Sequence, residues 1–229
     1  MVLAAVVTAG VALGLVIALS DGRGSASGAP GGRLAGTASV ARLLDGIPQH
    51  GTVLGRPDAP VRIVEFAGLQ CPYGREYTLG ALPQLVRDYV RTGKVQMQFE
   101  DMSFIGPDSM NAGHVAAGAA AQDKLWNFVD LMYLNQGPEN TGYATPSYLR
   151  SLLRAIPGLD VGAALRTSRS SSADAALTTA TSLAAEAGIT GTPSFLIGRS
   201  NGPLRLFEPP TLTAAPFESA LDGILKGSA

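Results

Sequence analysis

Residues 61–77 read VRIVEFAGLQCPYGREY, and this stretch decides the fold. Its first six residues are mostly β-branched and apolar and lie between Pro60 and Gly68, a pattern that predicts a buried strand. From Cys71-Pro72 onward, apolar residues recur at helical spacing over several turns, which predicts a helix. Cys71 is the only cysteine in 229 residues, and it stands where a strand passes into a helix.

A second strand is predicted at residues 94–102, where Val95, Met97 and Phe99 alternate with polar side chains. A strand, a helix and another strand in this order form a βαβ unit, which predicts a parallel pair of strands. The other elements we expect are helices at 40–44, 108–135, 146–156, 161–169, 172–187 and 216–226, and strands at 194–198 and 204–207. Together these elements indicate an α/β fold.

The composition excludes several classes of function. The chain has 46% apolar residues, 17 basic and 18 acidic residues, and a net charge of −1 without any block of like charge. This balance gives no electrostatic reason to expect a nucleic-acid partner. One cysteine cannot form a disulfide within the chain, and with only His50 and His114 beside it no metal site is predicted. No nucleotide-binding glycine motif is present, and no cofactor is expected.

The N-terminal part carries a different signal. Residues 2–19 contain no charged side chain, so residues 1–20 are expected to form a signal anchor or a signal peptide cleaved after Ser20. No Lys or Arg precedes this apolar run, which fits neither alternative well. Residues 21–44 are rich in Gly, Ser and Ala and are predicted to be a flexible tether. The folded part, residues 45–226, is then expected outside the cytoplasm, held at the membrane if the segment stays and secreted or periplasmic if it is cleaved.

Cys71 lies at a place where a helix favours an anion. The unpaired N–H groups of the first turn and the helix dipole stabilise a thiolate, so cysteines at such positions can have a pKa well below the ordinary value. We therefore expect a reactive, partly exposed thiol. The alternative is that Cys71 is a small buried hydrophobic residue without chemistry.

Two further positions stand out along the chain. The Thr192-Pro193 bond follows Gly191 and precedes a strand, which makes it a candidate for a cis peptide, although trans is the more frequent form. Glu65 is an acid inside an apolar strand, so it is either a functional buried acid or a surface residue at the strand end. His114 is expected on the surface of a helix, and the residues Trp126, Phe128, Met132 and Tyr133 are expected in a helical core.

Residues 51–75, GTVLGRPDAPVRIVEFAGLQCPYGR, resemble the active-site segment of the DsbA-like thiol–disulfide oxidoreductases of the thioredoxin superfamily. The resemblance continues through QDKLWNFVDLMYLNQGPENTG, similar to that family's helical insertion, and ends with AGITGTPSFLIG, similar to its cis-proline loop. It covers about residues 45–226 and implies a thioredoxin-like fold with a helical insertion domain at about residues 104–187.

The resemblance also implies roles for single residues. By position, Cys71 is the nucleophile and Glu65 a buried acid that assists proton transfer. Pro193 would be in cis, with Thr192 lining the substrate groove. The residues after the thiol that would contact the substrate are Pro72, Tyr73 and Gly74.

The chain departs from the family pattern at two positions. Gly74 stands where the second, resolving cysteine belongs, and Gly68 stands where family members often carry an acidic residue. Without a second thiol, Cys71 cannot store an intramolecular disulfide or release a trapped client by internal attack.

Three functions remain open. The first is a monothiol exchange enzyme that acts on client proteins with cysteines or disulfides, by isomerisation or reduction more than by net oxidation, with a low-molecular-weight thiol as an optional partner. The second is a non-catalytic module that binds peptides or proteins and has lost redox turnover. The third is sulfenic-acid chemistry at Cys71.

Overall fold

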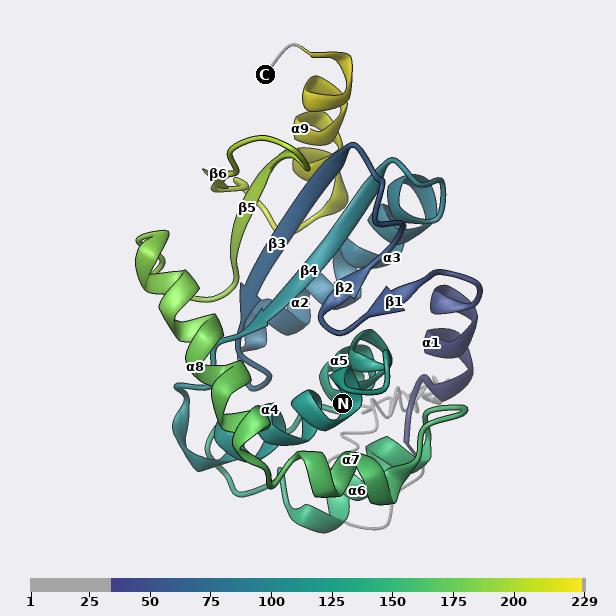
Figure 1. Cartoon of the computed structure of the whole chain (residues 1–229), viewed down its shortest axis with the longest axis vertical. Helices are drawn as coiled ribbons and strands as arrows, with labels where there is room; N and C mark the ends of the chain where they lie inside the picture. Colours follow the sequence, from purple (N-terminus) through teal and green to yellow (C-terminus); the bar gives the residue numbers. More distant parts are fainter. Residues whose placement is uncertain (1–33, 228–229) are drawn as a thin grey trace, which may run out of the picture.

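The computed structural model describes residues 34–227, in which six strands form one mixed sheet with the order β1-β2-β4-β3-β5-β6 (Figure 1). The two central strands, β3 and β4, are parallel, and every other pair is antiparallel. This confirms the predicted βαβ unit, whereas the short β1–β2 hairpin was not predicted. The strands are β1 Gln49–His50, β2 Val53–Leu54, β3 Val61–Ala67, β4 Val95–Asp101, β5 Ser194–Arg199 and β6 Arg205–Phe207.

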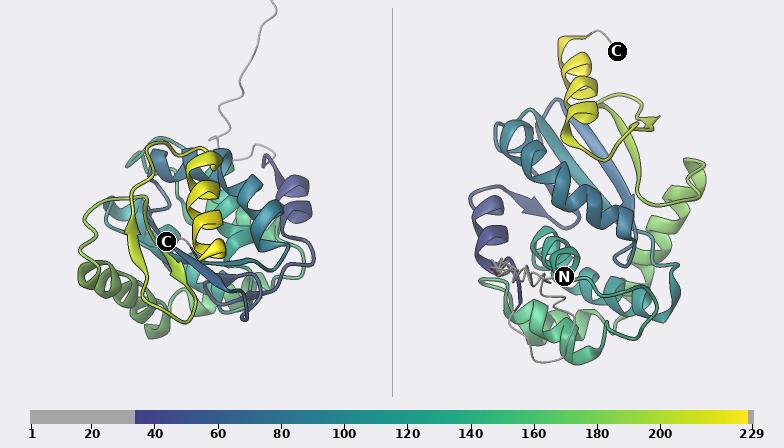
Figure 2. Two further views of the ribbon diagram at one scale, coloured as in Figure 1. Left: turned by 90° about the horizontal axis from the view of Figure 1, so that it is seen from above. Right: turned by 180° about the vertical axis from the view of Figure 1, so that it is seen from behind.

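The helical segment that joins β3 to β4 is divided into three parts. It comprises α2 Pro72–Gly80, α3 Leu82–Leu85 and the π-helical turn η1 Val86–Val90. The prediction of one continuous helix is wrong here, because Pro83 has no N–H to donate to the preceding turn and a new helix starts around it. This segment and α9, Ala214–Lys226, lie on the same face of the sheet (Figure 2).

Alternation along β3 decides which side chain meets which layer. Val61 and Ile63 belong to the large core that includes α2 and α9. Val64 and Phe66 pack on the opposite face against the C-terminal part of α8, Ser171–Glu186. Since successive side chains of a strand point to opposite faces, Glu65 shares the face of Val61 and Ile63. The acid of β3 therefore points toward the layer that contains α2.

Five helices lie between β4 and β5 and form the helical insertion, most of which lies below the sheet in Figure 1, while its last helix runs upward beside the sheet. The predicted helix 108–135 is wrong as one piece. It breaks at residues 121–124, where Asp123 has a left-handed backbone (φ 56°) and its carboxylate accepts a hydrogen bond from the Gly51 N–H at 2.8 Å. The insertion helices are α4 Gly106–Ala120, α5 Leu125–Leu134, α6 Pro146–Arg154, α7 Val161–Thr167 and α8 Ser171–Glu186. Trp126, Phe128, Met132 and Tyr133 are buried in α5, as predicted.

The N-terminal boundary of the folded part differs from the prediction. Helix α1, Thr37–Leu44, buries Val40 and Leu44 against the main core and packs beside α5, so these residues belong to the domain and not to a flexible tether. The predicted helix at 40–44 is confirmed and begins three residues earlier. The predictions for residues 1–20 and for 21–33 lie outside the described residues. Within residues 34–227, helices are too short or too polar to span a bilayer.

Asn135 fastens the start of the domain to the insertion. Its side chain is 2% exposed, accepts a hydrogen bond from the Ala35 N–H at 2.7 Å and donates one to the Ala35 carbonyl at 3.1 Å. We expect Asn135→Ala to lower the free energy of unfolding by about 1–3 kcal/mol, because both backbone groups lose their partner. Hydrogen exchange of residues 35–44 should accelerate.

The matched control is Ser39→Ala, which removes only the exposed hydrogen bond from Ser39 Oγ–H to the Gly36 carbonyl at the start of α1. If Asn135→Ala left exchange in α1 as slow as in the control variant, α1 would be held by its apolar contacts alone.

Candidate active site at the start of helix α2

Cys71 is the N-cap residue of α2. Its backbone is extended (φ −66°, ψ 122°), Pro72 takes the first helical position, and the Cys71 carbonyl accepts the first helical bond from the Arg75 N–H at 3.1 Å. The Cys71 N–H is itself held by the Gly68 carbonyl at 2.8 Å. The thiol therefore sits at the positive end of a nine-residue helix, where the sequence placed it.

The cis-proline loop lies directly against the thiol. The Thr192-Pro193 peptide is cis, as the sequence suggested, and the Cys71 Sγ–H donates to the Thr192 carbonyl at 3.3 Å. Cys71 is only 4% exposed, so the prediction of a partly exposed thiol is wrong. The strand-to-helix turn leaves the thiol open on one side, but the loop before β5 covers that side.

A groove runs beside this loop. It has a volume of about 500 Å³, and its wall includes Tyr73, Thr192, Pro193 and the stretch Leu206–Pro209. Tyr73 is 62% exposed, and Pro72 is also exposed at the mouth of the site. Three of the residues predicted to contact substrate thus line one cavity. Gly74 does not join them, because it is buried on the other side of α2.

Tyr133 explains why residue 74 is a glycine. A Cβ atom built on Gly74 would lie 2.6 Å from the Tyr133 hydroxyl and 3.1 Å from its ring carbon Cζ. Tyr133 is fully buried, and its hydroxyl donates to the Gly68 carbonyl at 3.0 Å. A side chain of α5 therefore fills the space that the second cysteine of a dithiol pair would need.

Gly68 is constrained in a similar way. A Cβ atom at this position would lie 2.9 Å from the Met102 carbonyl, while the Gly68 carbonyl accepts bonds from both Cys71 N–H and Tyr133 Oη–H. An acidic side chain here would have to displace the backbone that follows β4. The departure from the family pattern at Gly68 is thus a consequence of close backbone packing.

Two glutamines tie the active-site turn to the insertion. Gln136 Nε2–H donates to the carbonyls of Leu69 (3.2 Å) and Cys71 (3.3 Å). On the other side, Gln70 Nε2–H donates to the Ile105 carbonyl, and its Oε1 accepts from the Asn140 N–H. Neither residue was predicted, since a glutamine in a polar loop gives no signal that it will meet a distant turn.

Glu65 lies beneath α2 and is buried. It is 1% exposed, its neighbours in the sheet register are Phe99 and Phe195, and Oε1 finds no hydrogen-bond partner among residues 34–227. Burial, and then the charge of Asp130, raise the pKa of Glu65 well above the ordinary value. The burial of Glu65 is confirmed and the alternative of a surface residue is excluded, while its function stays a prediction.

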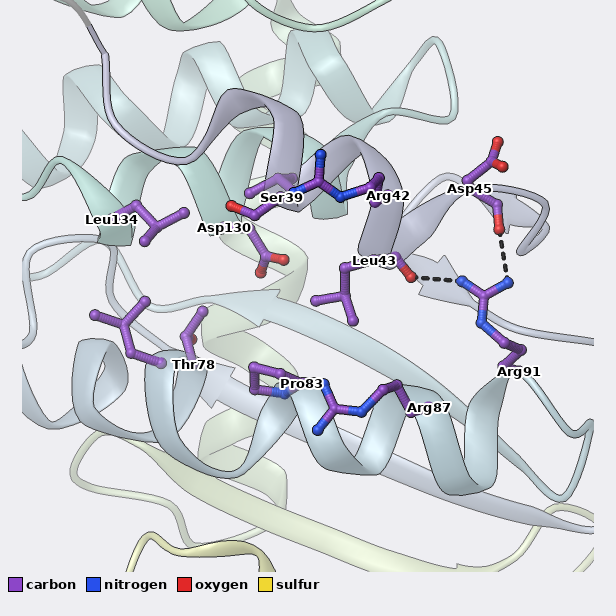
Figure 3. A pocket seen from close by; sticks show the side chains of 12 residues that line it. Ser39, Arg42, Leu43, Asp45, Thr78, Pro83, Arg87, Arg91, Asp130 and Leu134 are labelled. Carbon is purple, nitrogen blue, oxygen red and sulfur yellow. Dashed lines mark hydrogen bonds between the residues drawn. The ribbon is translucent and has the colours of Figure 1, made fainter.

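Asp130 is a second buried carboxyl near the same place, and the sequence prediction missed it. It belongs to α5, is 4% exposed, and burial raises its pKa to about 8. The signal was an acid inside the apolar run LWNFVDLMYL, the same kind of signal that drew attention to Glu65. Asp130 points toward a pocket between α1 and α2, shown in Figure 3.

Comparison with known proteins identifies the family to which this architecture belongs. Residues 49–203 match the family model described as thioredoxin. The chain belongs to the thioredoxin family. A protein named "Probable disulfide bond formation protein D" from Bacillus cereus is 37% identical over 111 residues, which are 47% of this chain and 51% of that protein. Disulfide bond formation protein D of Bacillus subtilis is 28% identical over 45% of this chain and 47% of its own length. The thioredoxin-family chain thus spans about half the length of the curated relatives it matches.

Solved structures confirm the predicted thioredoxin-like fold with a helical insertion. Oxidised BdbD from Bacillus subtilis superposes with a TM-score of 0.67 at 20% identity, over 79% of this chain and 98% of that one. DsbA from Chlamydia trachomatis gives a TM-score of 0.64 at 20% identity, over 78% and 93% of the two chains. At 20% identity, this structural similarity establishes the fold of the chain.

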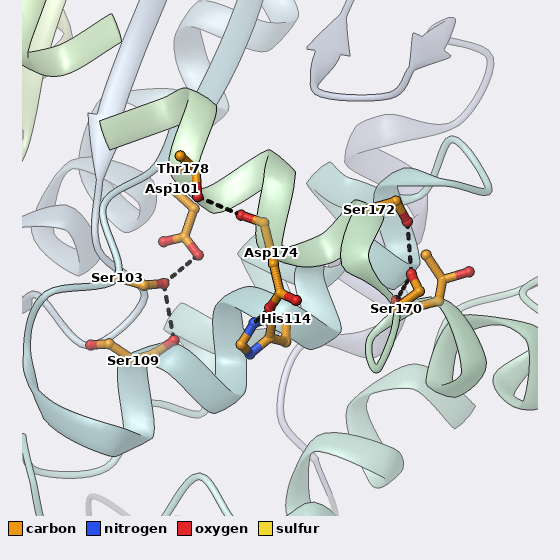
Figure 4. A network of polar contacts seen from close by, with 9 residues as sticks. Asp101, Ser103, Ser109, His114, Ser170, Ser172, Asp174 and Thr178 are labelled. Carbon is orange, nitrogen blue, oxygen red and sulfur yellow. Dashed lines mark hydrogen bonds and ion pairs between the residues drawn. The ribbon is translucent and has the colours of Figure 1, made fainter. Parts of the chain in front are cut away.

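His114 takes no part in the site as described so far. It lies on α4 and meets Asp174 of α8, with 2.9 Å between Nε2 and Oδ1, in the network drawn in Figure 4. Its side chain is 26% exposed, in keeping with the predicted surface position. Nearby, Ser103 Oγ–H donates to the buried Asp101 carboxylate at 2.7 Å. Within residues 34–227, no three His, Cys, Asp or Glu side chains gather as a metal site.

Proposed function

We propose that this thioredoxin-family protein exchanges thiols and disulfides through Cys71 alone. The observation that carries the proposal is the position of the thiol, at the N-terminus of α2 and 3.3 Å from the carbonyl of Thr192 beside the groove. The matched relatives are named for disulfide bond formation.

The reaction follows from having one thiol. Cys71 loses its proton and the thiolate attacks a client disulfide, so that a new Cys71–client bond forms while the other client sulfur leaves as a thiolate and takes up a proton. A second client thiol, or a low-molecular-weight thiol, then attacks the mixed disulfide and restores Cys71. Because Gly74 provides no resolving thiol, these two exchange steps suit isomerisation or reduction of client proteins rather than net oxidation.

Within this proposal, Cys71 is the nucleophile and Glu65 the buried acid that exchanges its proton. Tyr73, Thr192 and Pro193, which line the groove, contact the client, and the exposed Pro72 beside Tyr73 is a further contact. Disulfide exchange on proteins belongs to oxidising compartments, which supports a location outside the cytoplasm.

A binding module without turnover is the second candidate. It is favoured by one observation, the 4% exposure of Cys71 beneath the cis-proline loop. Such a module would use the same groove and would have no need of a reactive thiol.

Capture of a mixed disulfide separates the two candidates. We expect wild-type protein mixed with oxidised glutathione, or with a scrambled disulfide protein, to acquire a covalent adduct at Cys71 that a reductant removes, as measured by intact mass. Cys71→Ser is the control and should form no adduct. Absence of any adduct, together with groove binding that survives Cys71→Ser, would establish the binding module instead.

A further inference from the structure

A second cavity lies between α1, α2, α5 and η1, and it shares no lining residue with the groove beside Thr192 (Figure 3). Its volume is about 530 Å³, within the range of about 300–1,000 Å³ that is typical of small-molecule sites. We call this cavity the α1–α2 pocket. Its base, its walls and its rim differ in chemistry, and each restricts what the pocket can bind.

The base of the α1–α2 pocket carries two buried polar side chains. Asp130 of α5 is 4% exposed, Thr78 of α2 is 3% exposed, and both line the pocket. Asp130 Oδ1 and Thr78 Oγ1 find no hydrogen-bond partner among residues 34–227, and Figure 3 shows both side chains pointing into the space between the helices. Buried polar atoms are normally satisfied by protein groups or by a bound molecule. The base therefore offers two hydrogen-bonding groups to an occupant.

The chemistry of the base suits a neutral hydroxyl. A hydroxyl both donates and accepts, so it can pair with the carboxyl of Asp130 or with the hydroxyl of Thr78. Burial raises the pKa of Asp130 to about 8, so this acid is mostly protonated at neutral pH and attracts a cation only weakly.

The walls of the pocket are aliphatic. They are formed by side chains of α1, α2, α3 and α5, namely Val40, Leu43, Leu79, Pro83 and Leu134. An aliphatic chain placed against these side chains removes apolar surface of both partners from water, which favours binding. The walls therefore suit the hydrocarbon part of a ligand.

The rim of the pocket is positively charged. It carries Arg42, Arg87 and Arg91, and none of the three forms an ion pair among residues 34–227. Arg91 is held by the carbonyls of Leu43 and Asp45, at 2.8 Å each. Figure 3 shows the Asp45 carboxylate turned away from Arg91. Because guanidinium groups pair well with carboxylates, the rim suits an acidic group.

We propose that the α1–α2 pocket binds a small hydroxylated aliphatic acid, with its carboxylate at the arginines of the rim and its hydroxyl at Asp130 and Thr78. Binding is noncovalent and does not depend on the proposed exchange function. Since the pocket and the groove are lined by different residues, the ligand leaves Cys71 accessible to a client.

Three probes of one chain length test the proposal on the full chain. 10-Hydroxydecanoate carries the acid, the hydrocarbon and the hydroxyl, whereas decanoate lacks the hydroxyl and 1,10-decanediol lacks the acid. We expect 10-hydroxydecanoate to bind about tenfold more tightly than either, as measured by calorimetry, because each comparison removes one polar contact. Its largest effects on amide chemical shifts should fall in residues 39–45, 78–91 and 130–134.

Variants of the base should abolish the preference for the hydroxyl. Thr78→Val keeps the shape of the side chain and should reduce the difference between 10-hydroxydecanoate and decanoate. Adding Asp130→Leu should make the two probes bind equally. Asp130→Asn retains a hydrogen-bonding group and should keep the preference, which separates a polar contact from a change in pocket shape.

Variants of the rim should abolish the preference for the acid. Arg42→Gln combined with Arg87→Gln should weaken binding of 10-hydroxydecanoate about tenfold and leave that of 1,10-decanediol unchanged. The matched control is Arg150→Gln, which removes an exposed arginine of α6 outside the pocket and should change neither value.

Two results would overturn the proposal. The first is equal affinity of the wild type for all three probes, and the second is a set of chemical-shift changes confined to the groove beside Thr192. Cys71→Ser should bind 10-hydroxydecanoate as the wild type does. Failure of mixed-disulfide capture would therefore leave this site in place, and failure of probe binding would leave the exchange function in place.

Discussion

Gly74→Cys should destabilise this protein, and the introduced thiol should form a disulfide with Cys71 only poorly. Residues three apart in a helix have Cβ atoms about 5–6 Å apart, which by itself is compatible with a cysteine pair after adjustment. The obstacle is Tyr133, whose hydroxyl lies 2.6 Å from the position of the new Cβ. Overpacking of this kind costs about 1–3 kcal/mol.

Removing the Tyr133 hydroxyl should allow a disulfide to form between Cys71 and the thiol introduced at position 74. Tyr133→Phe removes the hydroxyl and leaves ring carbons at 3.1 and 3.3 Å, distances that a small shift can accommodate. We therefore expect the double variant Gly74→Cys with Tyr133→Phe to oxidise to an intramolecular disulfide far more completely than Gly74→Cys in the same glutathione buffer. The fraction oxidised can be measured by thiol trapping and mass.

Gly74→Ala separates the steric cost from the thiol chemistry, because it introduces the same Cβ without sulfur. Its loss of unfolding free energy should equal that of reduced Gly74→Cys within about 0.5 kcal/mol. If Gly74→Cys oxidised fully and kept wild-type stability, Tyr133 would not be the reason that this site works with one thiol.

Asp130→Asn should stabilise the protein at neutral and mildly alkaline pH. The folded-state pKa of Asp130 is about 8, above its value in the unfolded chain, so the unfolded state loses a proton at lower pH than the folded state does. Between about pH 4 and pH 8 stability therefore falls as the pH rises, by at most about 1.4 kcal/mol per unit for this group. The amide removes this penalty, so the free energy of unfolding at pH 8 should rise by a few kcal/mol, on the order of 5 kcal/mol at most.

Urea unfolding at several pH values from 4 to 8 measures this effect. The wild-type curve should slope downward with pH, and the Asp130→Asn curve should be flatter, with the two meeting near pH 4. Glu65→Gln should act in the same direction, since burial also raises the pKa of Glu65. Asp45→Asn, exposed on the pocket rim, should leave the slope as it is. Equal slopes in wild type and Asp130→Asn would show that this carboxyl ionises normally in the folded protein.

A penalty of this size would indicate that the two acids are kept for chemistry. Replacement by amides of the same shape would give a more stable domain, yet Glu65→Gln would remove the acid that is proposed to exchange the Cys71 proton. Stability and exchange activity should therefore change in opposite directions in these variants.

The sequence by itself determined the features that depend on neighbouring residues. The β3–Cys71–α2 junction, the parallel β3–β4 pair and the buried face of α5 follow from hydrophobic periodicity and from proline and glycine at the boundaries, which act over a few residues. The unusual acid at Glu65 was also visible, because an ionisable group stands out among the apolar residues of a strand.

Only the tertiary structure decided what surrounds the thiol. Tyr133 occupies the space beside Gly74, Thr192 covers Cys71, and Asp130 approaches Glu65, although the partners in each pair lie far apart in the chain. No local pattern encodes such contacts, since they depend on how the insertion docks on the sheet. The same docking recruits α1 into the core, because Val40 and Leu44 have a partner surface only once α5 is in place. The loss of the second cysteine can be read from the sequence, but the tyrosine that fills its place can be seen only in the fold.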